Sequence, residues 1–177
     1  MWVRRTTVAV VATAMLVLAA GVASAAAPVG VAREVMAGAP GRMPTTLRCV
    51  PKAALLTAGG RRHSLATVAV TVRTGQRWTV LLDRAQVCRP LYLYRTKARG
   101  ESVKVVNAVA TVLHEKAHVN GILVEWRATC AAIPAVLSQL RRWGYTTTQL
   151  EAAQWWLTDG ADNGRSAEYR LGGRCRV

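Results

Sequence analysis

Two of the three histidines in this 177-residue chain, His114 and His118, are four positions apart, and Glu115 follows the first of them. On a helix, residues four apart lie on the same face, one turn above the other. Two imidazoles placed in this way can bind one metal ion, and the adjacent glutamate can act as general base toward a water molecule on that ion. The H-E-x-x-H pattern therefore predicts a metal site with hydrolytic chemistry.

The stretch 102–119, which contains this pattern, has the periodicity of an amphipathic helix. Its apolar residues form one broad face at helical spacing: Val105, Val106, Val109, Val112, Leu113 and Ala117. A second, polar stripe at steps of four, three and four contains Asn107, Thr111, His114 and His118. We therefore expect the histidines to lie beside the core and not inside it.

A third ligand can come from Glu125, provided that the helix ends before it. On an unbroken helix Glu125 would lie roughly 10 Å beyond His118 along the axis, too far to share an ion. Asparagine and glycine tolerate the left-handed conformation that ends helices, so the Asn120-Gly121 pair predicts a turn there. A second helix would then return Glu125 to the histidines. Two histidines and one glutamate with an open position are a known catalytic zinc arrangement.

The run from His114 to Cys130 resembles the zincin metallopeptidases, in particular the gluzincins, whose third ligand is a glutamate on the following helix. The run Glu125-Trp126-Arg127-Ala128, continuing through Ala132, is similar to the E-x-x-A-x-x-x-A run of several gluzincins. The chain is also similar to short secreted actinobacterial H-E-x-x-H proteins of undefined activity, which share a basic signal peptide and E-x-x-A-x-C. The resemblance implies zinc on His114, His118 and Glu125, with Glu115 as catalytic base.

The rest of the chain predicts a small, helix-rich, zincin-like α+β domain. The stretches 66–74 and 77–83 alternate in polarity around Gly75 and predict a β-hairpin. We expect it to pack on the H-E-x-x-H helix and the helix that bears Glu125, and its edge would offer a place for a peptide, as in zincins. Further helices are predicted over 84–97, with Pro90 inside, over 122–143, ended or kinked at Pro134, and over 148–156 behind a capping box from Thr148 to Glu151.

Three regions follow along the chain. Residues 1–25 have the pattern of a signal peptide, with Arg4 and Arg5, an apolar run and a small-x-small cleavage site at Ala23-Ser24-Ala25. An uncleaved anchor is the alternative, although the run is short for a membrane span. Residues 26–46 are rich in Ala, Gly and Pro and are predicted to be a flexible linker. Residues 47–177 then form the zincin-like domain, and the protein is predicted to be secreted.

The four cysteines, Cys49, Cys88, Cys130 and Cys175, predict two disulfides in an exported chain. Of the three possible pairings we favour the sequential one, Cys49–Cys88 and Cys130–Cys175. The second bond would hold the C-terminal tail against the helix that bears Glu125. Tyr169 in that tail is then a candidate oxyanion stabiliser, as in some zincins, or an ordinary packing residue. A cysteine zinc ligand is the rival interpretation, without any C-x-x-C spacing to support it.

The formal net charge of +15 favours anionic partners such as cell-wall polymers or a membrane surface. Removal of residues 1–25 takes away two arginines and no acid, which leaves +13. The arginines are scattered, and no nucleic-acid-binding motif accompanies them, so specific nucleic-acid binding is not expected.

The sequence therefore predicts a secreted, monomeric zinc metallohydrolase, a peptidase acting on a peptide or protein substrate. The alternative is a non-catalytic exported basic protein that binds an anionic cell-envelope surface on a zincin-like scaffold, which the charged Lys116 inside the motif favours. A domain that zinc merely stabilises is a third interpretation; chelation would unfold it.

Overall fold

The computed structural model describes residues 27–97, 102–160 and 175, and the fold is α+β, as predicted. Helices predominate over a small sheet in these residues. In chain order the elements are α1 (Pro28–Ala37), β1 (Thr46–Val50), α2 (Lys52–Leu56), η1 (Ala58–Gly60), β2 (Ala69–Thr74), β3 (Arg77–Asp83), η2 (Arg84–Cys88), α3 (Arg89–Lys97), α4 (Ser102–Val119), α5 (Glu125–Arg142), α6 (Thr147–Trp155) and η3 (Trp156–Gly160).

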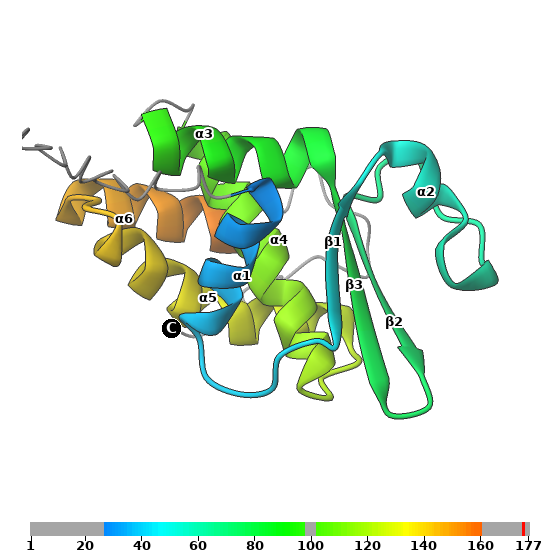
Figure 1. Cartoon of the computed structure of the whole chain (residues 1–177). Coiled ribbons are helices and arrows are strands. Elements are labelled where there is room, and N and C mark those ends of the chain that lie inside the picture. Colours follow the sequence, from blue (N-terminus) through cyan, green and yellow to red (C-terminus); the bar gives the residue numbers. More distant parts are fainter. Residues whose placement is uncertain (1–26, 98–101, 161–174, 176–177) are drawn as a thin grey trace, which may run out of the picture.

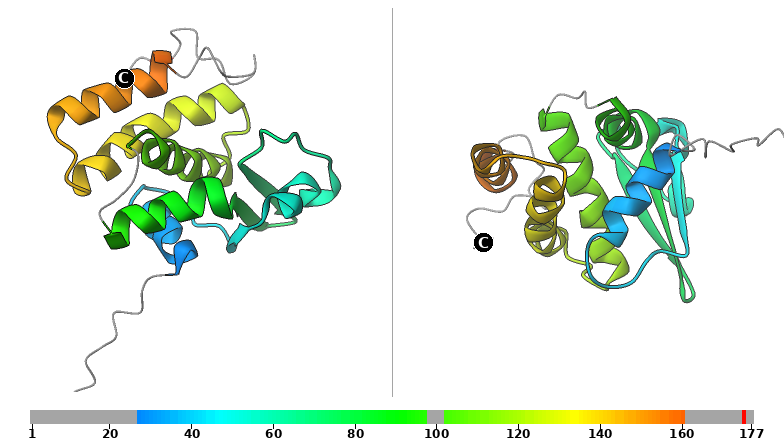
Figure 2. Two further views of the ribbon diagram at one scale, coloured as in Figure 1. Left: turned by 90° about the horizontal axis from the view of Figure 1, so that it is seen from above. Right: turned by 60° about the vertical axis from the view of Figure 1, so that its left-hand side comes forward.

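Helix α4 lies at the centre of the molecule, between the sheet and α5 (Figure 1). Helices α1 and α3 pack on it as well, and α6 covers the outer side of α5 (Figure 2). The apolar face predicted for 102–119 is buried, with Val105, Val109 and Val112 fully inaccessible. Because α4 contacts every layer, residues on its different faces belong to different surroundings: one face meets the sheet, one meets α1 and one meets α5.

The sheet has the strand order β1-β3-β2. Strands β2 and β3 form the predicted antiparallel hairpin, closed by a two-residue loop in which Gly75 has a φ of 60°. Strand β1, which was not predicted, pairs with β3 in parallel. Strand β2 is thus an edge strand, and this strand also packs against α4.

The prediction of a flexible linker over 26–46 is wrong at residues 28–37. Residues 28–37 form α1, whose Val31, Ala32, Val35 and Met36 are all buried in the main core. Their spacing of one, three and one is a helical pattern that the surrounding Ala, Gly and Pro residues obscured. Pro28 starts the helix at a position where its missing N–H is not needed.

Three predicted helix boundaries also differ. Helix α5 begins at Glu125 instead of Ile122, and it continues through Pro134 to Arg142. The capping box of α6 is formed by Thr146 and Gln149, two residues before the predicted one. In each case the helix exists where its apolar period predicts it, and only the position of its end was misjudged.

The predicted disulfide pairing is confirmed: Cys49 is bonded to Cys88 and Cys130 to Cys175. The first bond joins β1 to η2, and the second attaches Cys175 to α5. Two disulfides fit an oxidising compartment. The predicted signal peptide (1–25) and Tyr169 lie outside the described residues. Within the described ranges, no helix combines the length and the apolar content that a membrane span requires.

Candidate metal centre

A glycine-based helix end creates the turn on which this site depends. Gly121 has a φ of 96°, its N–H donates to the carbonyl of His118, and the N–H of Ile122 donates to the carbonyl of Ala117. These two hydrogen bonds are typical of a helix closed by a left-handed glycine. The chain then turns through 122–124 and enters α5 at Glu125, beside the last turns of α4. The predicted break at Asn120-Gly121 is therefore present.

The structure brings His114, His118 and Glu125 together. The two Nε2 atoms are 3.0 Å apart, and Oε2 of Glu125 lies 2.9 Å from Nε2 of His114 and 3.3 Å from Nε2 of His118. In a tetrahedral zinc site with bonds of about 2.0–2.1 Å, ligand atoms are about 3.3 Å from one another. The three atoms thus approximate one face of such a tetrahedron, and these residues can hold a metal ion.

Both imidazoles are oriented through their other nitrogen. Nδ1 of His118 lies 2.6 Å from the carbonyl oxygen of Ile122, and Nδ1 of His114 lies 3.1 Å from the hydroxyl of Thr129. Since a carbonyl only accepts, Nδ1 of His118 carries a proton, and its Nε2 offers a lone pair when the ring is neutral. Hydrogen bonds of this kind hold metal-binding histidines in the correct tautomer.

The charges of this cluster favour a cation between its members. Partial burial alone would raise the pKa of Glu125, but hydrogen bonds from His114 and His118 outweigh it and lower the pKa to about 2. Burial would lower the pKa of His118, yet the hydrogen bond to Glu125 and the charge of Glu115 raise it. A proton on His118 stabilises the metal-free cluster, and a metal ion would take the place of that proton.

Glu115 lies next to these residues and points toward the sheet. Its side chain is buried, and the hydroxyl of Thr71, on edge strand β2, donates to its Oε2 over 2.5 Å. Burial raises the pKa of Glu115, while the charges of His114 and His118 and the Thr71 hydrogen bond oppose that rise. A carboxylate with a raised pKa beside a metal site is suited to take a proton from water and pass it on.

Two polar residues, Lys116 and Asn120, lie two positions before and two positions after His118. Their side chains form hydrogen bonds with the end of α1 and with the segment that follows it. Nζ of Lys116 is 2.5 Å from the carbonyl oxygens of both Met36 and Ala39, and Oδ1 of Asn120 accepts from the N–H of Arg42 over 2.7 Å. Lys116 is only 2% exposed. Its charge is thus used inside the fold and contributes nothing to an exposed basic surface.

Two residues of this site were not identified from the sequence, Thr71 and Thr129. Thr129 is one helical turn after Glu125, so the i, i+4 rule applied to α5 could have found it. Thr71 is 44 positions before Glu115, and no local pattern connects them. The cysteines take no part, since all four are in disulfides. His63, the third histidine, contacts the carbonyl of Ala58 through Nε2 in a separate loop.

Comparisons of the chain with protein-family models, with curated proteins and with solved structures gave no match.

Proposed function

We propose that the protein is an exported zinc-dependent hydrolase that cleaves peptide bonds. The observation that carries this proposal is the convergence of Nε2 of His114, Nε2 of His118 and Oε2 of Glu125, with the buried carboxylate of Glu115 next to them. Two histidines and a glutamate are a donor set that zinc accepts in catalytic sites. The H-E-x-x-H pattern and the zincin resemblance of 114–130 support the same assignment.

Zinc bound there would polarise a substrate carbonyl and lower the pKa of a water molecule. Glu115 is the general base that removes a proton from the attacking water and afterwards delivers it to the leaving nitrogen. Thr71 holds one oxygen of this carboxylate and leaves the other for water. The lowered pKa of Glu125 keeps that residue anionic, as a ligand must be, over the physiological range of pH.

Strand β2 supports a peptide as the substrate. It is an edge strand of the sheet, and it carries Thr71, which touches the proposed base. An extended peptide can add to such an edge through main-chain hydrogen bonds, which places its carbonyl groups at a fixed distance from the strand. A peptide lying along β2 would therefore pass close to Glu115.

Export is part of the same proposal. The two disulfides form and persist in an oxidising compartment. The charged start, the apolar run and the small-x-small site of residues 1–25 support a cleaved signal peptide.

The proposal is tested with the mature, zinc-loaded chain and a mixture of unstructured peptides, analysed by mass spectrometry. We expect cleavage that stops on chelation and returns when zinc is added back. Circular dichroism should show a folded chain throughout, because the core and both disulfides do not depend on the metal. Cleavage that persists without metal, or a zinc-loaded chain that cuts no peptide, would contradict the proposal. Unfolding on chelation would instead favour a structural zinc ion.

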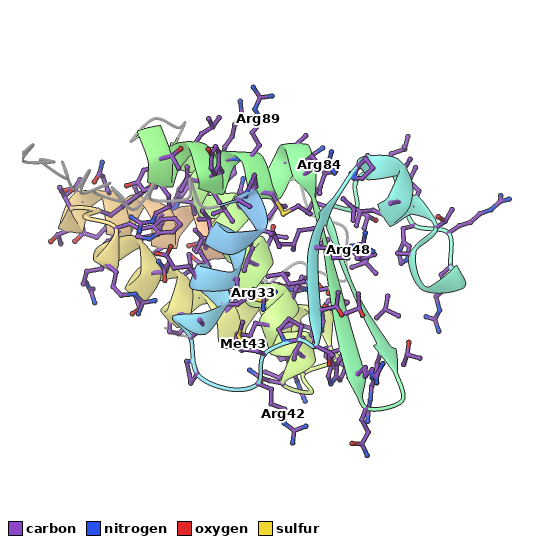
Figure 3. The ribbon with its side chains drawn as sticks, in the orientation of Figure 1. Arg33, Arg42, Met43, Arg48, Arg84 and Arg89 are labelled. Carbon is purple, nitrogen blue, oxygen red and sulfur yellow. A yellow bond between two sulfur atoms is a disulfide. The ribbon has the colours of Figure 1, made fainter. Side chains whose placement is uncertain are left out.

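A second candidate function is binding to an anionic cell-envelope surface, and a group of arginines favours it. Five exposed arginines are spread over α1, β1, η2, α3 and the loop before β1, and we call them the arginine surface: Arg33, Arg42, Arg48, Arg84 and Arg89 (Figure 3). Glu34 is the only acidic residue in the sequences of these four elements, and it pairs with Arg95 over 3.2 Å. The surface is therefore strongly positive.

The arginine surface can be tested by salt-dependent binding to vesicles that contain an anionic phospholipid, with neutral vesicles for comparison. Each basic residue near such a surface contributes about 1 kcal/mol, so Arg33→Gln with Arg48→Gln should weaken binding roughly tenfold or more. The control pair Arg61→Gln with Arg62→Gln removes the same charge from an exposed loop elsewhere. An equal loss in both double variants would mean that net charge, and not this surface, is responsible.

A further inference from the structure

The hydroxyl of Thr129 connects two of the three proposed metal ligands. Thr129 lies on α5, one helical turn after Glu125, and its Oγ1 donates to the main-chain carbonyl of Glu125 over 3.1 Å. The same oxygen lies 3.1 Å from Nδ1 of His114, on the neighbouring helix α4. The side chain is half-buried at the contact between these helices.

The number of protons on these atoms determines the direction of the second hydrogen bond. A threonine hydroxyl has one hydrogen and two lone pairs. Its hydrogen is used on the Glu125 carbonyl, which can only accept, so Oγ1 has lone pairs left for His114. Nδ1 of His114 must then be the donor. A neutral imidazole with its proton on Nδ1 has its lone pair on Nε2, the atom that faces Glu125 and His118.

We propose that Thr129 is a positioning residue that fixes the tautomer and the ring orientation of His114 for metal binding; this inference rests on the metal site of the proposed function. For His118 the same task is performed by the main-chain carbonyl of Ile122. The two histidine rings are therefore oriented by different groups: the ring of His118 by a main-chain carbonyl, and the ring of His114 by a side-chain hydroxyl. Since Thr129 also contacts the residue that supplies the third ligand, it sets the position of His114 relative to the start of α5.

The chain offers a matched control for this hydroxyl. Thr111, on α4, also donates its hydroxyl to the carbonyl four residues before it, that of Asn107, over 2.8 Å, and it is half-buried as well. Replacing it with valine removes the same kind of helix-internal hydrogen bond at no cost to either histidine. Thr129→Ser keeps the hydroxyl and loses only a methyl group.

The experiment measures the zinc dissociation constant of the mature chain by competition with a chromogenic chelator, which needs no substrate. Loss of a hydrogen-bond partner of a metal-bound histidine typically weakens binding about 10–100-fold, so we expect a loss of this size in Thr129→Val. Thr129→Ser and Thr111→Val should stay within about threefold of the wild type. Nitrogen-15 NMR of the zinc-loaded chain should show the proton of His114 on Nδ1.

The results separate this inference from the proposed function. If the wild type binds zinc and Thr129→Val binds it equally well, the inference is wrong and the metal site stands. An affinity lost to the same degree in Thr129→Ser would also contradict it, because the hydroxyl is then not the cause. A folded wild-type chain that binds no zinc would overturn both. Circular dichroism of each metal-free variant identifies any loss that comes from unfolding.

Discussion

Zinc bound by the wild-type chain should be lost when either His118 or Glu125 is replaced by alanine. Each variant removes one of three protein ligands, which is a larger change than the removal of a hydrogen-bond partner. We therefore expect the affinity to fall by more than roughly 100-fold, the upper end of the range for such partners. Metal content by mass spectrometry, together with the competition assay, measures the effect. Both variants should still fold: the side chain of Glu125 is half-buried, and that of His118, although buried, is not part of the hydrophobic core.

Two matched variants test whether the loss of any histidine or any glutamate, even one outside the site, weakens zinc binding. His63→Ala removes the third histidine, which contacts Ala58 in a separate loop, and Glu34→Ala removes a glutamate that pairs with Arg95 on the surface. Neither should change zinc binding. If zinc is lost in His118→Ala and retained in Glu125→Ala, the third ligand has been misassigned. A chain that retains zinc in both variants binds the metal elsewhere.

The sequence was sufficient for the part of the site that depends on local rules. His114 and His118 come together because a helix repeats every 3.6 residues, and Glu125 joins them because a glycine ends that helix at Gly121. Both rules act over a few residues and can be applied without knowledge of the fold. The hairpin around Gly75 was predicted for the same reason.

The sequence was insufficient where a contact joins distant parts of the chain. Thr71 meets Glu115 only because the edge strand packs against α4, and Lys116 reaches the carbonyls of Met36 and Ala39 only because α1 packs there too. The charged Lys116 inside the motif was interpreted as favouring a non-catalytic protein that binds an anionic surface, but its side chain is buried. Its ammonium group instead donates to two carbonyl oxygens near the end of α1, those of Met36 and Ala39, and lies 3.9 Å from Sδ of Met43. A positive charge is favourable at the carboxyl end of a helix.

Helix α1 itself shows how composition can mislead. Its sequence contains Ala, Gly and Pro, and Pro40 and Pro44 follow it, so the whole stretch was interpreted as a linker. Burial of Val31, Val35 and Met36 against α4 stabilises the helix from outside, and this packing outweighs the weak intrinsic tendency of its residues. Short helices in proteins owe most of their stability to such contacts, which a local pattern does not reveal.

The second large effect is expected for Glu115→Gln, which should abolish turnover and leave zinc in place. Glutamine has nearly the shape of glutamate and can still accept the hydrogen bond of Thr71, so the surroundings of the site should be unchanged. It cannot take up the proton of the attacking water. General bases contribute about 10²–10⁴-fold to a rate, and we expect kcat to fall by that factor with a zinc affinity close to that of the wild type. Hydrolysis at the wild-type rate would exclude Glu115 as the base.

The same variant should make the metal-free chain more stable at neutral pH. Burial raises the pKa of Glu115 in the folded chain above its ordinary value of 4.5. Between the two pKa values the folded state binds more protons than the unfolded state, so the stability of the wild type falls as the pH rises through that window. Glutamine carries no charge at any pH. The melting temperature of Glu115→Gln should therefore exceed that of the wild type at pH 7, and the two should converge as the pH approaches 4.

Glu151→Gln is the matched control, because it removes an exposed glutamate from α6 and should leave the melting temperature unchanged at every pH. A gain of about 1 kcal/mol would raise the melting temperature of a domain of this size by about 3 °C, which calorimetry resolves. Equal melting temperatures for wild type and Glu115→Gln across the pH range would contradict this prediction. They would mean that interactions with neighbouring groups fully offset the cost of burying the Glu115 charge. A glutamate retained only because it stabilises the fold would not decrease the stability of the folded chain. The combination of lost turnover, retained zinc and increased stability is therefore what distinguishes a catalytic base from an ordinary buried glutamate.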